Sequence, residues 1–536
     1  MSVFVNNIIN QVGRLPDRQV YGRVSAVVGL LVEVGGVQGG LSIGDHCRII
    51  GRDDRRVRCE VVGFREGSAL LMPLGSLDGV GLGCRVELSD TDSMIYPDPG
   101  WLGRVVNAFG EPVDGKGPLP MGGDPYPVRN RPPPAYLRQR IGGKIDLGVR
   151  AMNAFLTCCR GQRMGIFSGS GVGKSTLLSM MARYTEAEVS VIGLVGERGR
   201  ETREFIEDDL GPEGLARSVV VVATSDEPPL MRRQAAYVTM AVCEYFRDRG
   251  NDVLCLMDSV TRFAMAQREI SLSAGEPPAS KGYTPSVFAE LPALLERAGP
   301  GMAGQGSITG LFTVLVEGDD LNEPVADAVR GILDGHVVLD RAIAERGRFP
   351  AVNVLKSVSR TMPGCNTDEE NAIVDRSRQL LAAYEDMAEL IRLGAYRKGS
   401  DPVIDEAIHY YPALEGFLTQ TKSQQTNLED CYRLLSEILD MSPPGAERDS
   451  VPAAEAAPEP PAPAGVSPAA QAAPEPPAPA GAEPVPAPVH PDLASEPELA
   501  AALQPSMVPS LAPPPEPKGD EKPAAGGDKG EGGKET

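Results

Sequence analysis

The chain has 536 residues, and its 73 acidic against 52 Lys and Arg side chains give a formal net charge of −21, which argues against nonspecific nucleic-acid binding as the main activity. Its nine cysteines form no C-x-x-C pair and no metal-like spacing with the four histidines, so we expect reduced thiols. A basic, apolar signal segment and an apolar run of about 20 residues are both missing, which predicts a cytoplasmic protein.

The N-terminal segment, residues 1–18, has an amphipathic pattern. Phe4, Ile8 and Val12 recur at helical spacing, so their side chains would share one face of a helix. Two interpretations stay open for this segment. It is either a short helix that docks on a partner protein, or a terminal segment that packs on its own domain or frays.

A small β-barrel is expected next, over residues 19–96. Short apolar runs alternate there with turns rich in glycine and aspartate. Phe64 is the only aromatic residue between Ser25 and Asp90, so the barrel has no stacking platform for bases and we expect it to be structural. Residues 97–141 are rich in glycine and proline and are predicted to form a connector.

A glycine-rich loop follows a predicted strand at Arg163–Phe167 and precedes an apolar helical pattern. The loop residues are Gly169, Ser170, Gly171, Val172, Gly173, Lys174, Ser175 and Thr176. Strand, loop and helix form the context of a P-loop, in which backbone amides bind phosphate oxygens. We expect Lys174 to reach the β- and γ-phosphates and Ser175 to bind Mg²⁺. Ser168 stands where the strict pattern has glycine, and we interpret it as a tolerated variant.

Residues 142–366 alternate strand-like and helix-like segments, which predicts an α/β domain with a mainly parallel sheet covered by helices. The expected strands are apolar runs at Arg163–Phe167, Val189–Val195, Ser218–Ala223, Asp252–Met257 and Ser307–Val316. In such a sheet the ligand binds beyond the carboxyl ends of the strands. Residues directly after each strand are therefore the candidates for catalysis.

Two carboxylates stand at such positions, Glu197 and Asp258. A carboxylate at Glu197 can orient and activate water for in-line attack on a γ-phosphate. Asp258 suits the shell of Mg²⁺, as in a Walker B element. Each has an ordinary alternative, an exposed charged turn for Glu197 and a helix cap for Asp258. The P-loop upstream favours the catalytic interpretation of both.

The remainder of the chain divides into two parts. Residues 367–442 carry apolar stripes at helical spacing, which are typical of a helical domain core or of a groove for a partner. Residues 443–536 lack aromatic side chains and repeat one Pro- and Ala-rich decapeptide at 456–465 and 472–481. That composition predicts a disordered tail with no catalytic role.

Together these motifs resemble the ATPases of type III secretion and flagellar export systems, which are related to the catalytic subunit of rotary ATP synthases. The likeness runs from roughly residue 20 to residue 439. Its most specific segments are Gly161–Arg163, the P-loop, Gly196–Glu201, Asp258–Ala264, Glu276–Pro278, Gly282–Phe288, Phe349–Ala351 and Ser357–Arg360. The resemblance implies a RecA-like P-loop domain between the barrel and the helical domain, and ATP as the substrate.

The resemblance also implies roles for residues beside the P-loop. Glu197 would be the catalytic carboxylate, supported by Arg198. Asp258 would orient a water of the metal, and Glu201 would support the metal side of the site. Arg262 would approach the γ-phosphate.

Two further roles are implied by the resemblance. Phe349 matches an aromatic residue that stacks on adenine, and Arg360 matches an arginine finger that enters the neighbouring subunit's site. Such a finger requires a ring, and the family implies a homohexamer. The alternative for Arg360 is a surface ion pair worth ~0–1 kcal/mol.

The leading hypothesis is therefore a Mg²⁺-dependent ATPase ring that releases export substrates from chaperones. Partners implied by the resemblance are a coiled-coil regulator or stator, a central stalk protein, an export gate and chaperone–substrate complexes, with peripheral association at the inner membrane and no nucleic acid. Alternatives are a rotary synthase subunit, a noncatalytic nucleotide-binding ring subunit and a Rho-like RNA-dependent ATPase. Whether the system is flagellar or injectisome-like stays open.

Overall fold

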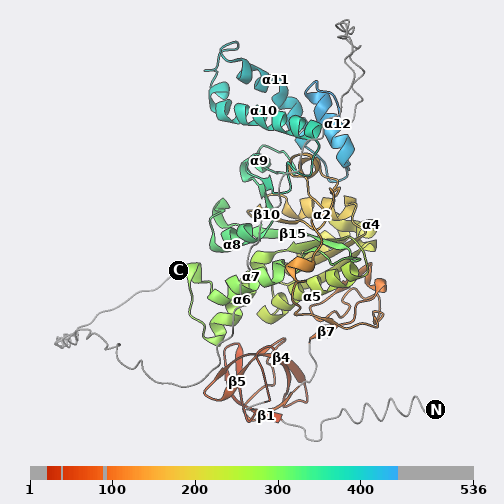
Figure 1. Ribbon diagram of the computed structural model, residues 1–536. Helices are drawn as coiled ribbons and strands as arrows, with labels where there is room; N and C mark the ends of the chain where they lie inside the picture. Colours follow the sequence, from red (N-terminus) through yellow and green to blue (C-terminus); the bar gives the residue numbers. More distant parts are fainter. Residues whose placement is uncertain (1–20, 38–39, 89–92, 445–536) are drawn as a thin grey trace, which may run out of the picture. The chain divides into compact units, whose positions relative to one another are not determined.

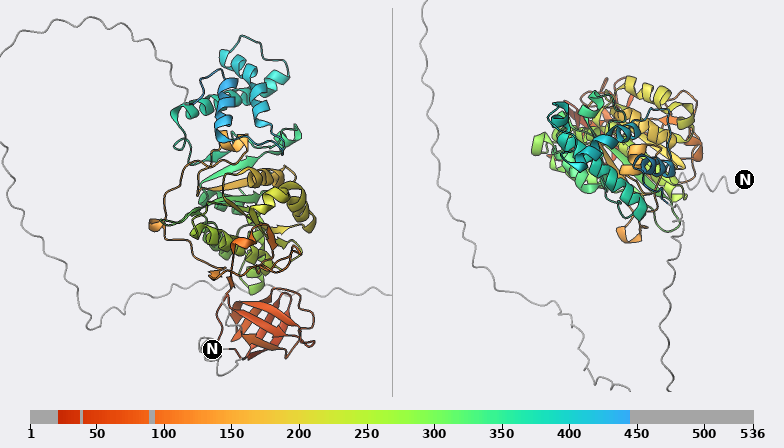
Figure 2. Two further views of the ribbon diagram at one scale, coloured as in Figure 1. Left: turned by 90° about the vertical axis from the view of Figure 1, so that its right-hand side faces the viewer. Right: turned by 90° about the horizontal axis from the view of Figure 1, so that it is seen from above.

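The computed structural model describes residues 21–37, 40–88 and 93–444. The expectations for the N-terminal segment, and nearly all of those for the tail, fall outside the described residues. Six antiparallel strands close a barrel, which Figure 1 and the left view of Figure 2 show. Their order around the barrel is β1-β2-β5-β4-β3-β6. They are β1 (Tyr21–Val28), β2 (Leu31–Gly35), β3 (His46–Ile50), β4 (Arg56–Arg65), β5 (Ser68–Pro73) and β6 (Arg85–Leu88). Alternate side chains point inward, as the expected barrel requires.

The central sheet has the strand order β17-β16-β10-β15-β13-β11-β12-β8, with β14 beside β15. Its strands are β8 (Arg104–Val106), β10 (Arg163–Ser168), β11 (Val189–Glu197), β12 (Ser218–Thr224), β13 (Val253–Asp258), β14 (Gly299–Pro300), β15 (Ser307–Leu315), β16 (Gly335–Leu339) and β17 (Val358–Ser359). Strands β8, β10, β11, β12, β13, β15 and β16 run parallel, and β14 and β17 are antiparallel additions. The expected mainly parallel sheet is confirmed.

Helices cover both faces of this sheet. They are α2 (Lys174–Tyr184), α3 (Gly199–Glu204), α4 (Gly211–Ala216), α5 (Pro229–Asp248), α6 (Val260–Ala274), α7 (Pro285–Leu295), α8 (Pro324–Ile332) and α9 (Arg341–Glu345). Successive strand residues enter different cores: Val191 packs with α5, whereas Ile192 packs with α2. Figure 1 shows α2 and α5 on opposite sides of β15. Burial on both faces explains why the strand sequences are continuous apolar runs.

Four strands of the sheet were not expected, and one of them is the two-residue strand β14 beside β15. Strand β8 comes from the segment predicted to be only a connector, and it pairs with β12. Strands β16 and β17 lie between helical segments and are short. An antiparallel pair, β7 (Met94–Ile95) and β9 (Tyr126–Pro127), also forms within the connector region. Such short strands carry too few residues for a periodic signal.

The C-terminal part is helical, as expected, with α10 (Asp368–Arg392), α11 (Pro402–Leu418) and α12 (Leu428–Ile438). Thr367 and Glu370 form a capping box that starts α10. The apolar stripes expected from the sequence contribute to the hydrophobic core, because Ile373 and Leu380 of α10 and Leu435 of α12 are buried. Within the part of the chain that the structure describes, no helix is long and apolar enough to cross a membrane.

Short helical turns connect these elements. They are η1 (Pro99–Trp101), η2 (Ala135–Leu137), η3 (Ala151–Phe155), η4 (Phe205–Leu210), η5 (Ser280–Gly282) and η6 (Glu317–Asp319). The η3 turn precedes β10, and all five of its residues are buried; Ala151, Met152, Ala154 and Phe155 belong to the hydrophobic core that also contains Ile192. It therefore anchors the segment that leads into the P-loop strand.

Candidate active site

The P-loop connects the end of β10 to the start of α2. Gly171 and Gly173 have φ values of +75° and +89°, which only glycine adopts without strain. Gly173 is the residue before the first helical residue, Lys174. The turn therefore delivers Lys174 and Ser175 to the helix N-terminus, where free backbone N–H groups favour an anion.

Ser168, the irregular position, is the last residue of β10 and not part of the turn. Its carbonyl accepts a hydrogen bond from the Val316 N–H at 3.1 Å, and its backbone is outside the left-handed region. Its buried hydroxyl has no hydrogen-bond partner within the described structure. Serine therefore causes no backbone strain here, which supports its interpretation as a tolerated variant.

Lys174 lies between the two candidate carboxylates. Its Nζ is 2.5 Å from Asp258 Oδ1 and 3.4 Å from Glu197 Oε1. The three side chains are only 11%, 4% and 15% exposed, in the order Lys174, Asp258 and Glu197. The Thr313 hydroxyl also donates to Asp258 Oδ1, at 2.8 Å, a contact that the sequence did not suggest. The cluster thus holds one positive and two negative charges away from water.

The sheet explains why these carboxylates meet. Glu197 is the last residue of β11 and Asp258 is the last residue of β13. The two strands are parallel neighbours, with Leu194 opposite Asp258. Carboxyl ends of neighbouring parallel strands share one edge, so both side chains face the P-loop region.

The charges shift the pKa values within the cluster. Burial acts to lower the pKa of Lys174, but the charges of Asp258 and Glu197 outweigh it and raise that pKa. Burial and then the charge of Asp258 raise the pKa of Glu197, while Lys174 and Arg262 oppose them. Glu197 is therefore a stronger base than an exposed carboxylate.

Arg262 lies in the first turn of α6 and packs against the backbone of Gly196. A Cβ at Gly196 would meet the Arg262 Cβ at 2.9 Å, and Gly196 has a φ of +71°. The buried Nε of Arg262 makes no hydrogen bond within the described residues. A buried guanidinium nitrogen without an acceptor beside the Glu197 cluster suits an incoming anion.

Arg198 and Glu201 lie at the surface. Arg198 NH1 is 2.8 Å from Glu201 Oε1, and the side chains are 77% and 47% exposed. Arg198 and Glu201 therefore form an ion pair with each other, whereas the ion-pair partners of Lys174 are Glu197 and Asp258. No preformed cluster of three or more His, Cys, Asp or Glu side chains that could hold a metal occurs in the described ranges.

Phe349 borders the P-loop. Its Cδ1 is 3.2 Å from the position that a Cβ would occupy on Gly173, and the residue is 44% exposed. Its carbonyl accepts a hydrogen bond from the Gln420 N–H at 2.8 Å, which ties this segment to the loop after α11. An exposed aromatic ring next to a phosphate-binding loop fits a stacking partner for a base.

Arg360 lies far from the P-loop of its own chain. It is exposed and directly follows β17, and its N–H donates to Asp334 O at 3.0 Å. The Asp334 N–H in turn donates to the carbonyl of Arg163, the first residue of β10, at 2.8 Å. The P-loop begins at the other end of β10, about 17 Å away at ~3.3 Å per residue.

Sequence models of known families match most of the described chain. The ATP synthase alpha/beta family matches with its beta-barrel domain at residues 24–89 and its nucleotide-binding domain at residues 148–359. The C-terminal domain of the T3SS EscN ATPase matches at residues 366–437. These three matches follow the barrel, the central sheet and the C-terminal helices.

A flagellum-specific ATP synthase of Caulobacter vibrioides is 59% identical over 440 residues, which cover 81% of this chain and 99% of that protein. The chain belongs to the type III secretion and flagellar export ATPases. Two other relatives of this export ATPase are a flagellum-specific ATP synthase of Bacillus subtilis and a type 3 secretion system ATPase of Xanthomonas euvesicatoria. The Bacillus protein is 53% identical, and the match covers 78% of this chain and 95% of that protein. The Xanthomonas protein is 48% identical, and the match covers 78% of this chain and 94% of that protein.

Solved structures agree with this assignment. The assembled ATPase EscN of the enteropathogenic E. coli type III secretion system matches with a TM-score of 0.72 and 38% identity, over 78% of this chain and 100% of that one. The same protein in complex with its central stalk EscO gives the same values. The export ATPase is accordingly an ATP hydrolase, and the rotary-synthase, noncatalytic and Rho-like alternatives are not favoured.

Proposed function

We propose that this export ATPase hydrolyses ATP at sites shared between identical subunits, each subunit supplying the P-loop of one site and the arginine finger of the next. The placement of Arg360 and the P-loop at opposite ends of β10 carries the proposal. An arginine that cannot reach its own P-loop can complete a site only in another copy. A head-to-tail contact of this kind closes into a ring, which we propose to be a hexamer.

At each site, Lys174 would exchange its carboxylate partners for the β- and γ-phosphates of ATP. The Ser175 hydroxyl and Asp258 offer the hard oxygen donors that Mg²⁺ prefers, and Glu201 is a candidate at the rim. A bound Mg²⁺ would neutralise the charge that develops on the phosphate oxygens. Gly169 to Thr176 would cradle the phosphates, and Phe349 would stack on adenine.

Glu197 would then orient the attacking water and accept its proton. Its raised pKa supports this role, because a stronger base matches the proton that it must take up. Arg262, with a buried nitrogen that lacks an acceptor in the described structure, would contact the γ-phosphate. Arg198 would support Glu197 from the surface.

We further propose that hydrolysis releases substrates from their chaperones and helps export them through a type III apparatus of flagellar or injectisome type. The relatives' names support that role. The complex of EscN with EscO supports a central stalk partner for this chain. A coiled-coil regulator or stator, an export gate and a peripheral place at the inner membrane complete the proposal.

Two variants test the shared site. Glu197→Gln should bind ATP and lose turnover. Arg360→Ala should also bind ATP, and its turnover should fall by ~10³-fold or more, because a finger is worth ~10³–10⁵ in rate. Steady-state ATPase assays and nucleotide titrations measure both effects, with Arg397→Ala as a control for loss of an exposed arginine. A mild defect in Arg360→Ala, similar to that control, would contradict the proposal.

A further inference from the structure

The residues on both sides of Arg360 are tied to one buried amide, that of Gln162. Gln162 directly precedes β10 and is completely buried. Its Nε2 donates to Ser359 Oγ and to Asp334 O, each at 3.0 Å. Its Oε1 accepts from the Thr361 hydroxyl at 3.0 Å. The neighbours of Arg360 in the chain are therefore both hydrogen-bonded to the same side chain.

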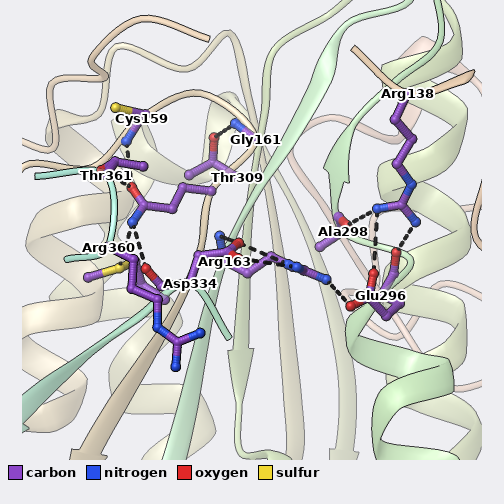
Figure 3. Close-up of polar contacts among 12 residues, drawn as sticks. Arg138, Cys159, Gly161, Arg163, Glu296, Ala298, Thr309, Asp334, Arg360 and Thr361 are labelled. Carbon is purple, nitrogen blue, oxygen red and sulfur yellow. Dashed lines mark hydrogen bonds and ion pairs between the residues drawn. The ribbon is translucent and has the colours of Figure 1, made fainter. Parts of the chain in front are cut away.

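The same network fixes the backbone of Arg360. Asp334 O accepts from both the Arg360 N–H and Gln162 Nε2. The hydroxyls of Ser359 and Thr361 lie 3.0 Å apart, in hydrogen-bonding contact. Figure 3 shows Thr361 and Asp334 near the backbone of Arg360, with the guanidinium extending away from this group.

The carboxylate of Asp334 is held by an ion pair with Arg163. Arg163 donates through Nε to Asp334 Oδ2 at 3.0 Å and through NH2 to Oδ1 at 3.2 Å. Arg163 NH1 also lies 2.5 Å from Glu296 Oε1, and Arg138 contacts the carbonyl of Glu296, as Figure 3 shows. The carbonyl that anchors Arg360 thus belongs to a residue fixed on two sides.

The Arg360 side chain itself has little to orient it. Its guanidinium is exposed, and the one hydrogen bond described for it is from NH2 to Arg330 O at 3.4 Å. A long exposed side chain of this kind takes its direction from its backbone. The Gln162 network therefore fixes the position from which the Arg360 side chain extends.

We propose that Gln162 is a positioning residue for the arginine finger, which it sets in place for the site of the neighbouring subunit. This inference rests on the proposed function, in which Arg360 acts in a second copy of the chain. A catalytic group displaced by ~1 Å can lose ~10²-fold in rate. Gln162→Leu keeps a similar volume and removes all the hydrogen bonds, so its kcat should fall by about 10- to 100-fold.

Mixed rings separate this role from damage to the P-loop of the same chain. Gln162→Leu subunits keep an intact Glu197, and Glu197→Gln subunits keep an intact finger. In an equal mixture that exchanges subunits, about one quarter of the interfaces combine the two intact parts in a head-to-tail ring. The mixture should regain activity well above that of either variant alone. The nucleotide Kd of Gln162→Leu should stay within about threefold of the wild type, because its P-loop is unchanged.

Arg360→Ala mixed with Glu197→Gln is the reference experiment. Recovery in this pair without recovery in the Gln162→Leu pair would overturn the role of Gln162 and leave the shared site intact. Failure of both pairs would overturn the shared site itself. A nucleotide Kd that is more than about threefold higher in Gln162→Leu would also contradict the inference, because it would indicate a defect in the variant's own P-loop.

Two variants control for folding. Gln234→Leu removes another buried glutamine, whose Nε2 donates to Ser93 Oγ at 2.7 Å, and it should keep its kcat. Thr361→Val removes one hydroxyl from the network at nearly constant shape and should lower kcat several-fold with a melting temperature near that of the wild type. If Gln162→Leu unfolds, Thr361→Val decides, because an unchanged kcat or an increased nucleotide Kd in this variant would overturn the role of the network.

Discussion

Lys174, Glu197 and Asp258 form a buried cluster with a net charge of −1. In the proposed mechanism, nucleotide binding would replace the 2.5 Å contact between Lys174 and Asp258 with contacts to phosphate. In the proposed mechanism the carboxylates would then be free to hold a metal ion and to orient water, as hydrolysis requires. The ion pairs of Lys174 therefore hold the three proposed catalytic side chains together.

The raised pKa of Glu197 predicts an acid limb in the rate profile. Burial first, and then Asp258, raise this pKa, so activity that needs the carboxylate should fall at a pH above the usual range for Glu as the solution is acidified. Arg262 lowers the same pKa, so Arg262→Gln should move the limb to higher pH. The measurement is kcat/KM against pH for both proteins. A limb that stays in place in Arg262→Gln would contradict the electrostatic role of Arg262.

At the level of elements, β8 extends the central sheet from a segment that was expected only to connect domains. Arg104 on β8 binds Asp114 through two hydrogen bonds, of 2.7 and 2.9 Å, and the side chains are 12% and 6% exposed. The Asp114 carboxylate also accepts from the Val105 N–H at 3.1 Å. This pair thus fastens the turn after β8 to the strand itself.

Removing this pair should destabilise the protein. Asp114→Ala leaves the partly buried Arg104 guanidinium without its carboxylate, although the Gly117 carbonyl still accepts from it, and this costs about 2 kcal/mol of unfolding free energy. The Arg104 hydrogen bond holds the Asp114 pKa well below its usual value, so the stabilisation is present above the unfolded pKa of about 3.9 and is lost as the pH falls through the lower folded pKa. Thermal melting at pH 7 measures the loss.

A matched control is Asp124→Ala. Asp124 and Arg249 form a pair at 3.0 Å, but their side chains are 71% and 36% exposed. An exposed pair is worth ~0–1 kcal/mol, so this variant should melt close to the wild type. Equal losses in the two variants would contradict the importance assigned to the buried pair.

The sequence could predict that Lys174, Glu197 and Asp258 lie together because each residue is marked by its own local pattern. A glycine loop follows one strand, and Glu197 and Asp258 end two others, so the rule for carboxyl ends of parallel strands brings them together. Strand β17 escaped prediction because it has two residues, and Gln162 was part of a noted motif without a role. Its contact with Ser359 joins residues 197 positions apart, which no local pattern reveals.

On the scale of the whole molecule, the proposed site needs parts that a single subunit holds near opposite ends of β10. The P-loop lies at the carboxyl end of β10, and the network that carries Arg360 lies at its start. Family membership makes the chain an export ATPase, and this separation is the reason why we propose that its sites form between subunits.

The most direct test is the specific ATPase activity as a function of protein concentration, with oligomer size measured on the same samples. Because the finger is worth ~10³–10⁵ in rate, dilution to monomers should reduce specific activity by a similar factor, and activity should rise and reach a plateau as rings form. A specific activity that stays constant down to concentrations where the protein is monomeric would contradict the shared site.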